Sequence, residues 1–435
     1  MHIDVRDQMK ITKFSKLAAA TTIGALALTS CGGGGDAEGT AEDPVELRFA
    51  WWGSEDRNAS TQEIIDAFEE ENPGITVEGS YNDWTGYQDQ LATQVASGDG
   101  PDIVQLDDEF ISEYADRGSL LELTDVDTSE IAPAVVEGGQ ADGTQYAIPT
   151  GVNALVMMAN PQLFEEAGVE IPDDTTWTWD DYLEISETIH EETGAYGTNK
   201  PIAQTMMIWL RQHDKSMFTE DGGIGFNEED AEEYFTLLSD MMDSNALASA
   251  SELVEEESQT LEAALIATNQ AAMGMSWTNQ LPVMSEASGN ELIPLRFPSP
   301  TGNVEDNGLW FKNTMLVAAT ASTDYPEEAQ MFIDFMINSE EAGEANLMDR
   351  GLPSNLQVRE SVLESVEGQD LVAAEFVADL DDEITDSEVL PPVGFTGISD
   401  ALTNRQQDVY FDRMTPAEAA ESFVADVEEI LASNE

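Results

Sequence analysis

The sequence predicts an α/β protein in which mostly parallel strands carry helices on both faces, divided into two lobes. From Val45 onward, runs that alternate apolar and polar residues exchange with runs of helical periodicity, in the order strand, helix, strand, helix, strand. The chain that follows the first 30 residues is roughly 400 residues long and exceeds the usual size of one domain. The composition of the whole sequence, 41% hydrophobic with 8 Trp and 16 Phe, is sufficient for a large core.

The first half of this pattern can be followed segment by segment. "VELRFAWWG" alternates apolar residues and predicts a strand, and "NASTQEIIDAFEEENPG" has apolar residues at helical spacing before a Pro-Gly stop. "ITVEGSY", "WTGYQDQLATQVASGDG" and "PDIVQL" predict strand, helix and strand. Such sheets bind ligands beyond the carboxyl ends of their strands, so we expect Trp51, Trp52, Asp107 and Glu109 at one rim.

The remaining elements are predicted in the same way. A second α/β region is expected over about 156–304, with helices near 180–192, 228–243 and 259–268. Residues 314–338 read as strand, turn and helix, and residues 416–431 as an amphipathic helix.

The N-terminus has the pattern of an export signal. Three lysines precede an apolar run over residues 17–28 that is too short for a membrane span, which takes roughly 20 residues. Leu28-Thr29-Ser30-Cys31 resembles the bacterial lipobox, which implies cleavage before Cys31 and a lipid on its thiol. We expect a signal peptide over 1–30 and a flexible tether over 31–43, rather than a core cysteine among glycines. The acids before Met9 leave either Met1 or Met9 as the start.

The charge of the chain excludes several classes of partner. The formal net charge is −72, and removal of residues 1–30 takes away four of the 16 basic and two of the 88 acidic residues, which leaves −74. Such a surface repels nucleic acid and anionic lipid, so we expect membrane contact through the lipid only. We also expect a salt-adapted protein, because salt at 1 M shortens the Debye length to about 3 Å.

Few residues are available for catalysis. Beyond the signal peptide only His190 and His213 remain, and neither has the context of a nucleophilic site. Zinc spacings, a P-loop and a dinucleotide fingerprint are absent from the sequence, so no cofactor or metal is expected. A carboxylate pair is harder to exclude, and the acids at 107–109 are open to three interpretations: catalytic pair, acceptors for sugar hydroxyls, or acidic surface.

Several segments together resemble a known family. They are "WWGSEDRNASTQEIIDAFEEENPGITV", "LATQVASGDGPDIVQLD", "YAIPTGVNALVMMANPQLFEEAGVEIP", "PEEAQMFIDFMINSEEAG" and "RGLPSN". In order and spacing they resemble the extracellular solute-binding proteins of bacterial ABC importers, in the carbohydrate-binding group that includes maltose-binding protein. The resemblance implies the two-lobed periplasmic-binding-protein fold, type II-like, with crossover strands and a ligand cleft. By this similarity, lobe one takes residues 44–155 and 305–345, and lobe two takes residues 156–304 and 346–435.

Sugar binding favours aromatic plates above and below a pyranose ring. At least one of Trp51 and Trp52 is expected to stack on the ligand, with packing of both as the alternative. Trp277, with Asn279 beside it, matches the family segment that presents an aromatic residue to the sugar. Trp84 and Trp310 are candidates on equal terms with structural roles, whereas Trp177 and Trp179 are expected to be structural.

Polar groups are expected around the edge of the sugar. Basic residues are rare in this chain, so Arg57 and Arg350 are candidates to grip hydroxyls, with ion pairs to acids as the alternative. Asp107, Glu109 and Asn153 offer acceptors and an amide near the first crossover. Lys312 lies in a stretch, "FKNTM", that resembles the family, with bracing of the hinge as the alternative to a sugar contact.

These observations lead to a functional prediction. We expect a lipid-anchored, monomeric sugar receptor on the extracellular face of the membrane, which delivers a mono- or oligosaccharide to an ABC permease powered by a cytoplasmic ATPase. It is not expected to be an enzyme. The alternatives are a surface carbohydrate hydrolase with a carboxylate pair, and a receptor of the same fold for a polyamine, peptide or iron complex.

Overall fold

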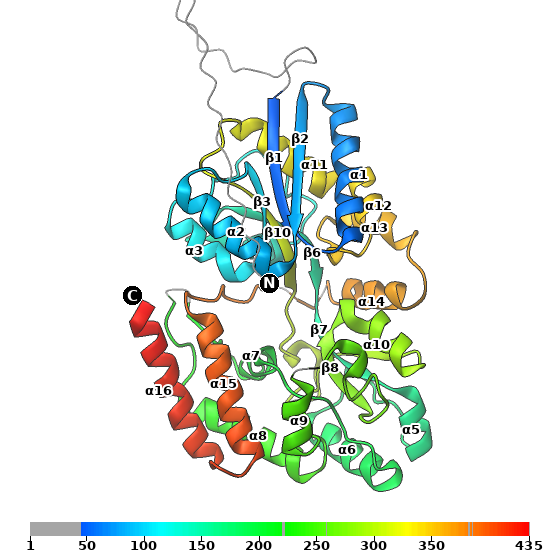
Figure 1. Cartoon of the computed structure of the whole chain (residues 1–435). Coiled ribbons are helices and arrows are strands. Elements are labelled where there is room, and N and C mark those ends of the chain that lie inside the picture. The colour runs from blue at the N-terminus through cyan, green and yellow to red at the C-terminus, as the bar shows by residue number, and fades with distance from the viewer. Residues whose placement is uncertain (1–44, 220–221, 258, 382, 385, 435) are drawn as a thin grey trace, which may run out of the picture. The chain divides into compact units, whose positions relative to one another are not determined.

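The computed structural model describes residues 45–434 except 220, 221, 258, 382 and 385 (Figure 1). The predicted signal peptide, Cys31 and the tether lie outside the described residues. The described part contains a six-stranded sheet, a three-stranded sheet and a two-stranded hairpin. Among these residues, no helix combines the length and the hydropathy needed to cross a membrane.

The first half of the six-stranded sheet confirms the predicted alternation of strands and helices. Strand β1 (Val45–Trp52) pairs in parallel with β2 (Ile75–Asn82) and with β3 (Ile103–Leu106). Helix α1 (Glu55–Glu71) connects β1 to β2, and α2 (Trp84–Ser97) connects β2 to β3.

Both connecting helices begin at a residue whose side chain caps the first turn, and α2 ends at a glycine. The Ser54 hydroxyl caps α1 by accepting a hydrogen bond from the backbone N–H of Arg57 at 3.2 Å. The Asp83 carboxylate caps α2 in the same way, accepting from the N–H of Gly86 at 3.0 Å. Helix α2 ends at Gly98, whose φ of 74° lies in the left-handed region that favours glycine.

The other half of the sheet returns from later parts of the chain. The strand order is β11-β6-β10-β3-β1-β2. Strand β10 (Lys312–Ala319) runs antiparallel between β3 and β6 (Ala147–Asn153). The sheet is therefore mixed, and the prediction of mostly parallel strands is wrong, because only β1 with β2 and β1 with β3 pair in parallel. With α11 (Pro326–Asn338), β10 confirms the predicted strand, turn and helix of residues 314–338.

The last strand of this sheet comes from beyond residue 346. Strand β11 (Leu352–Pro353) pairs with β6, and α13 (Leu356–Leu363) packs against β11 and α12 (Glu340–Asn346). The first sheet and its helices therefore draw on residues up to about Leu363. The lobe boundaries given by the resemblance stay predictions.

Both faces of the six-stranded sheet are covered. Side chains of Leu47, Phe49 and Trp51 share a core with α1 and α11, and the two rings of Phe49 and Phe332 lie 5.4 Å apart. Trp52 packs on the opposite face, in a core that includes residues of α2 and of α3 (Ile111–Asp116). Alternation along β1 therefore sends neighbouring tryptophans into two different interiors.

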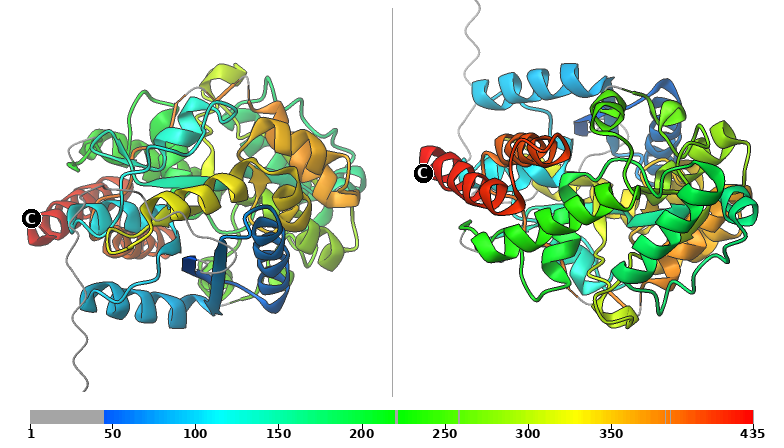
Figure 2. Two further views of the ribbon diagram at one scale, coloured as in Figure 1. Left: turned by 90° about the horizontal axis from the view of Figure 1, so that it is seen from above. Right: turned by 90° about the horizontal axis from the view of Figure 1, so that it is seen from below.

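The three-stranded sheet organises the second lobe. Strand β7 (Leu155–Ala159) lies between β8 (Met273–Trp277) and β9 (Ile293–Leu295), antiparallel to both. Figure 2 shows α15 and α16 side by side, and both helices pack against α8. The helices that follow β7 in the chain, other than α11 to α13, are α5 (Pro161–Ala167), α6 (Trp179–Thr193), α7 (Ala203–Arg211), α8 (Glu228–Asp243), α9 (Ala250–Glu256), α10 (Leu281–Ser288), α14 (Gly368–Asp379), α15 (Phe395–Tyr410) and α16 (Pro416–Asn434).

Of the helices predicted near 180–192, 228–243, 259–268 and 416–431, three are confirmed, by α6, α8 and α16. The helix predicted near 259–268 is wrong: residues Leu261–Ala263 form one short 3₁₀ turn. The Glu256 carboxylate accepts a hydrogen bond from the N–H of Leu265 at 2.9 Å, and Asn269 has a φ of 58°. A side chain therefore holds this segment as a loop. Helix α4 (Pro133–Glu137) and the hairpin β4 (Gln140–Ala141) with β5 (Thr144–Gln145) complete the described elements.

Candidate functional site

The two sheets meet at a crossover of a single residue. Strand β6 ends at Asn153 and β7 begins at Leu155, with Ala154 between them. The Thr278 hydroxyl donates to Asn153 Oδ1 at 3.2 Å, and the N–H of Ala154 lies 3.2 Å from the same hydroxyl oxygen. Asn153 also pairs with Lys312 across β6 and β10. The crossover is thus tied to the turn that follows Trp277.

A pocket of about 470 Å³ lies beside Trp277. The indole is partly exposed and belongs to the last residue of β8. Around it are planar and charged polar groups, among them the Gln259 and Gln280 amides and the Lys200 ammonium, which is held 2.6 Å from a Glu257 carboxylate oxygen. The volume falls within the range of about 300–1,000 Å³ for small-molecule sites. We call this the Trp277 pocket.

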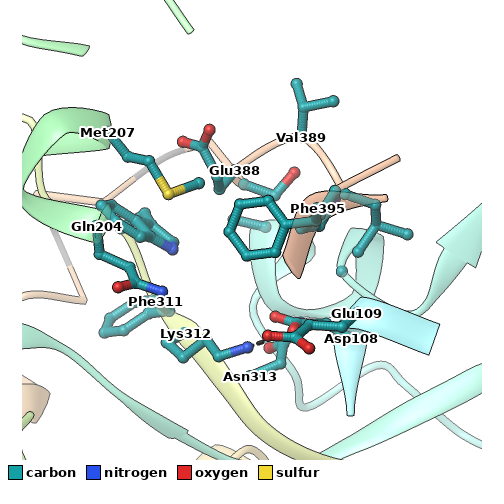
Figure 3. A pocket seen from close by; sticks show the side chains of 16 residues that line it. Asp108, Glu109, Gln204, Met207, Phe311, Lys312, Asn313, Glu388, Val389 and Phe395 are labelled. Carbon is teal, nitrogen blue, oxygen red and sulfur yellow. Dashed lines mark hydrogen bonds and ion pairs between the residues drawn. The ribbon is translucent and has the colours of Figure 1, made fainter. Parts of the chain in front are cut away.

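A second, smaller pocket encloses about 50 Å³ (Figure 3). We call it the Glu388 pocket. Its lining comes from distant parts of the chain: the turn after β3, α4 and its end, helix α7, the start of β10, and the segment before α15. The residues are Asp108, Glu109, Ala134, Gly138, Gln204, Met207, Trp310, Phe311, Lys312, Asn313, Ser387, Glu388, Val389, Leu390, Pro391 and Phe395.

Lys312 and the acids after β3 form a charged cluster at this pocket. The ammonium lies 3.5 Å from an Asp107 carboxylate oxygen and in closer contact with Asp108. Burial, together with the negative charge of Asp108, raises the pKa of Asp107 to about 8. Burial acts to raise the pKa of Asp108, but the charge of Lys312 and the hydrogen bonds to the carboxylate outweigh it, so the pKa of Asp108 is lowered. Burial raises the pKa of Glu109, with Lys312 opposing.

Asp107 and its neighbours therefore take different roles. Asp107 caps the 3₁₀ turn Asp108–Phe110 by accepting from the N–H of Glu109 at 3.3 Å. Lys312, the first residue of β10, reaches the turn after β3. Of the three acids, Asp108 and Glu109 line the Glu388 pocket.

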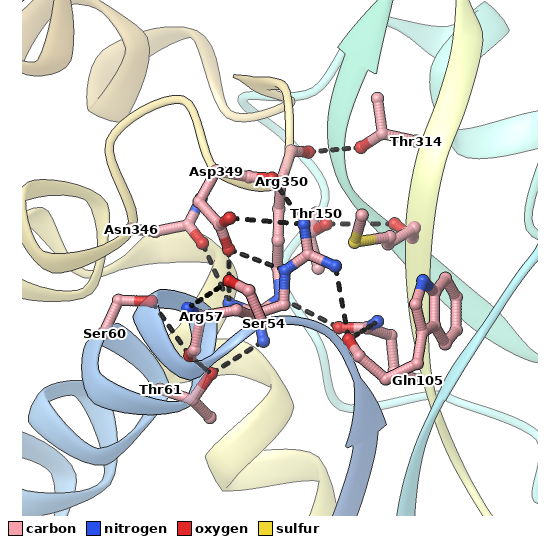
Figure 4. Close-up of polar contacts among 12 residues, drawn as sticks. Ser54, Arg57, Ser60, Thr61, Gln105, Thr150, Thr314, Asn346, Asp349 and Arg350 are labelled. Atoms are coloured by element: carbon pink, nitrogen blue, oxygen red, sulfur yellow. Dashed lines mark hydrogen bonds and ion pairs between the residues drawn. The ribbon is translucent and has the colours of Figure 1, made fainter. Parts of the chain in front are cut away.

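Arg57 and Arg350 belong to a polar cluster behind β1 (Figure 4). Arg57 Nε donates to an Asp349 carboxylate oxygen at 2.6 Å, so the ion pair left open by the sequence is formed. Arg350 is fully buried and donates to Gln105, Thr61 and Asn346 at 2.9, 2.7 and 3.0 Å. Burial and the charge of Arg57 lower its pKa to about 9. The predicted contact of Arg350 with a sugar is corrected: its donors hold α1, β3 and α12 together.

The tryptophans after β1 also require a correction. Trp51 is 1% exposed, lies 4.9 Å from the Phe49 ring and stacks on Tyr81 at 6.2 Å, so it is a core residue and not a ligand plate. Trp52 is 8% exposed and lies edge-on to Trp84, with ring centroids 4.9 Å apart. Helices cover both faces of the sheet, which explains why neither indole of the pair projects freely. Trp84 itself is 42% exposed.

The remaining candidates divide between the pockets and the surface. Trp310 is buried, lines the Glu388 pocket and lies below the Arg211 guanidinium, 5.8 Å from its ring centroid. Asn153 is buried at the crossover. Asn279 is exposed and lines neither pocket. Trp177 and Trp179 are buried, as expected for structural residues.

Comparison with known proteins decides the family. The family model described as bacterial extracellular solute-binding protein matches residues 52–343. The chain belongs to this family. Its mixed α/β architecture matches the two-lobed periplasmic-binding-protein fold. A solved solute-binding protein, family 1, of Alicyclobacillus acidocaldarius is 26% identical with a TM-score of 0.75, over 89% of this chain and 99% of that one.

Two curated relatives match a part of this solute-binding protein. An arabinooligosaccharide-binding protein of Halalkalibacterium halodurans is 28% identical over 47% of this chain and 46% of its own length. A lipoprotein of Streptomyces antibioticus is 25% identical over 45% of this chain and 44% of its own length. The chain therefore spans about half the length of these two relatives.

Several residues that line the two pockets of this solute-binding protein could not be found by sequence reasoning. Lys200, Gln259 and Gln280 lie in loops or short turns around the Trp277 pocket, where no periodicity marks them. Glu388 lies in the connection before α15, one acid among many. A partial signal existed for Asn313, because it follows Lys312 in a segment that the resemblance covers.

Proposed function

We propose that this solute-binding protein is the sugar receptor of an ABC importer, which captures a mono- or oligosaccharide between its lobes and delivers it to a membrane permease powered by a cytoplasmic ATPase. The Trp277 pocket carries the proposal. It combines a partly exposed indole with amide and charged side chains in about 470 Å³, beside the crossover between the two sheets. The family and the arabinooligosaccharide-binding relative support the same substrate class.

Stacking and hydrogen bonding account for how such a pocket holds a sugar. An indole face covers the apolar C–H face of a pyranose, and the amides of Gln259 and Gln280 offer donors and acceptors for its hydroxyls. The Lys200 ammonium is paired with Glu257, and Glu256, which accepts a hydrogen bond from the backbone N–H of Lys200, adds a second carboxylate to the lining. This combination suits a ligand rich in hydroxyl groups.

We propose binding without bond cleavage. The two described histidines hold structural positions: His190 Nδ1 lies 3.1 Å from the Ala195 carbonyl oxygen, and His213 Nδ1 lies 2.7 Å from that of Trp209. Asp107 and Asp108 are committed to Lys312. These contacts favour a receptor over a hydrolase with a carboxylate pair.

We also propose that Cys31 anchors the protein as a monomer to the extracellular face of the membrane. The lipobox resemblance and the matched Streptomyces lipoprotein support the anchor.

A melting-temperature screen tests the proposal. Purified protein is heated with neutral, amino and acidic saccharides, polyamines, peptides and iron chelates, and hits are confirmed by calorimetric titration. A sugar at 100 times its Kd should stabilise the fold by about 2.7 kcal/mol. Chromatography of the sugar after overnight incubation should show no product. Stabilisation by a polyamine, peptide or iron complex alone would contradict the sugar proposal, and released product would contradict the receptor.

A further inference from the structure

The Glu388 pocket contains two buried hydrogen-bond acceptors without a donor. Glu388 Oε1 and Asn313 Oδ1 are both inaccessible, and neither finds a partner within the described part of the chain. Both side chains line the pocket and are labelled in Figure 3. Buried polar atoms are nearly always paired in native proteins, so two in one small pocket point to a group that enters from outside.

The cations around the pocket are already engaged. Arg211 Nη1 donates to the other Glu388 oxygen, Oε2, at 3.1 Å, and Arg211 Nη2 donates to Asp386 at 2.9 Å. Lys312 is held by Asp107 and Asp108. The two unpaired atoms, Glu388 Oε1 and Asn313 Oδ1, are both acceptors, and the Glu388 carboxylate makes their combined charge negative.

Other lining groups fit the same chemistry. Glu109 adds a further carboxylate, and the Gln204 amide provides both a donor and an acceptor. Trp310 and Phe395 supply aromatic walls. A space of about 50 Å³ holds a few water-sized groups, which is room for a ring substituent and not for a whole sugar.

The two pockets lie on either side of the same structural junction. Lys200 and Ile202, just before α7, line the Trp277 pocket, whereas Gln204 and Met207, in the first turns of α7, line the Glu388 pocket. Lys312 pairs with Asn153, which accepts from Thr278 next to Trp277. The two pockets are therefore linked through the start of α7 and through the crossover.

We propose that the Glu388 pocket receives a hydroxyl or amino substituent of the bound saccharide and rejects a carboxylate, so that the protein takes neutral or amino sugars and excludes uronates. This inference rests on the proposed sugar function. An entering hydroxyl donates its single proton to one of the two unpaired acceptors, Glu388 Oε1 or Asn313 Oδ1, and an ammonium group has enough N–H donors for both. A sugar carboxylate brings only acceptors and a like charge, and both oxygens stay unpaired.

Calorimetric titration with matched saccharides tests the inference. The probes are galactose, galactosamine and galacturonate, and glucose, glucosamine and glucuronate, as mono- and disaccharides at pH 8 and constant salt. Burial raises the pKa of Glu388 to about 7, so its carboxylate is mainly ionised under these conditions. We expect the neutral or amino member of a series to bind at least about tenfold more tightly than the uronate.

The Glu388→Gln variant locates the effect. It should weaken amino-sugar binding by about tenfold and narrow the gap to the uronate, because one negative charge leaves the pocket. Glu360→Gln, at an exposed position of α13, makes the same change of net charge and should leave the selectivity unchanged. A thermal melt of each variant confirms folding.

Two outcomes overturn the inference alone: a uronate that binds as tightly as its neutral partner, or a selectivity that Glu388→Gln and Glu360→Gln alter equally. If no saccharide of any series binds, the proposed sugar function fails as well.

Discussion

Arg57 and Asp349 form an ion pair with a nitrogen–oxygen distance of 2.6 Å, although 292 positions separate them in the chain. Arg57 Nη2 also donates to the Asp349 carbonyl oxygen at 2.9 Å, and Nη1 donates to the Trp52 carbonyl oxygen at 3.2 Å. One guanidinium thus joins the first turn of α1, the end of β1 and the segment after α12. Asp349 lies 3.8 Å from Arg350 as well, so it faces two cations.

Removal of this carboxylate should destabilise the fold. Asp349→Ala leaves Arg57 and the buried Arg350 with less compensation, and we expect a loss of about 2 kcal/mol in the free energy of unfolding. Urea denaturation at fixed salt measures it. The exposed pair Arg117 and Glu113 is the control, and Glu113→Ala should cost less than about 0.5 kcal/mol. Equal effects of both variants would contradict a structural role for Asp349.

Trp277→Ala should weaken sugar binding. Loss of the indole removes the aromatic plate of the Trp277 pocket, and we expect about 2 kcal/mol, roughly thirtyfold in Kd. Calorimetric titration with the saccharide found in the screen measures the change. Phe411→Ala removes another aromatic side chain, 38% exposed and outside both pockets, and should leave the Kd unchanged. An unchanged Kd in Trp277→Ala would place the ligand elsewhere.

Glu388 should make the fold less stable as the pH rises from about 4.5 to 7. Burial raises its pKa from 4.5 to about 7, with Arg211 opposing. In this window the folded state binds more protons than the unfolded state, so stability falls with pH and levels off above 7. The contribution is at most about 3 kcal/mol. Glu388→Gln should flatten the stability curve between pH 4.5 and 7 relative to Glu360→Gln, as followed by urea denaturation. If the free energy of unfolding changed with pH to the same extent in both variants, Glu388 would not be the group responsible.

Salt should stabilise this acidic protein. At 0.1 M salt the Debye length is about 10 Å and repulsion between the surface carboxylates extends over several side chains, whereas at 1 M it is about 3 Å. We expect the melting temperature to rise by several degrees between these two KCl concentrations. Sucrose, which stabilises by exclusion without screening, is the control. Equal melting temperatures in dilute buffer and in 1 M KCl would count against a salt-adapted fold.

Cys31→Ser should abolish lipid attachment. In a bacterial host that is fed labelled palmitate, the wild-type protein should carry label and a mature N-terminus at Cys31, as determined by mass spectrometry. The variant should carry none and leave the membrane fraction. Label that persists in the Cys31→Ser protein would exclude this thiol as the attachment point, because it is the only cysteine in the chain.

The sequence predicted secondary structure well where the signals, such as helix stops, lie within a few residues of the element. Gly98 marks the end of α2 where the sequence predicted it. The predicted segment for α1 begins at Asn58, whereas the helix begins at Glu55 with Ser54 as its cap. The loop at 259–268 could not be inferred from the sequence, because the Glu256 side chain that holds it acts through tertiary geometry.

The candidate site was harder to predict than the fold. Trp277 was found through the family resemblance, and its pocket needs loops that have no pattern of their own. Trp51 misled because burial on a strand depends on which helices cover each face, here α1 and α11. The scarcity of basic residues drew attention to Arg350, but scarcity cannot distinguish an arginine that joins buried elements from one that contacts a ligand.

The single-residue link at Ala154 limits how the two sheets can move against each other. With β6 and β7 both fixed in their own ladders, only a few backbone torsions around Ala154 remain to absorb a rotation, and the Thr278 hydroxyl holds the N–H of that residue. Of the other connections, residues 296–311 are longer and restrict the movement less, and residues 364–367 link α13 to α14. The single-residue link therefore sets the pivot, so a glycine or a proline at position 154 should change the rate of opening more than any substitution within residues 296–311.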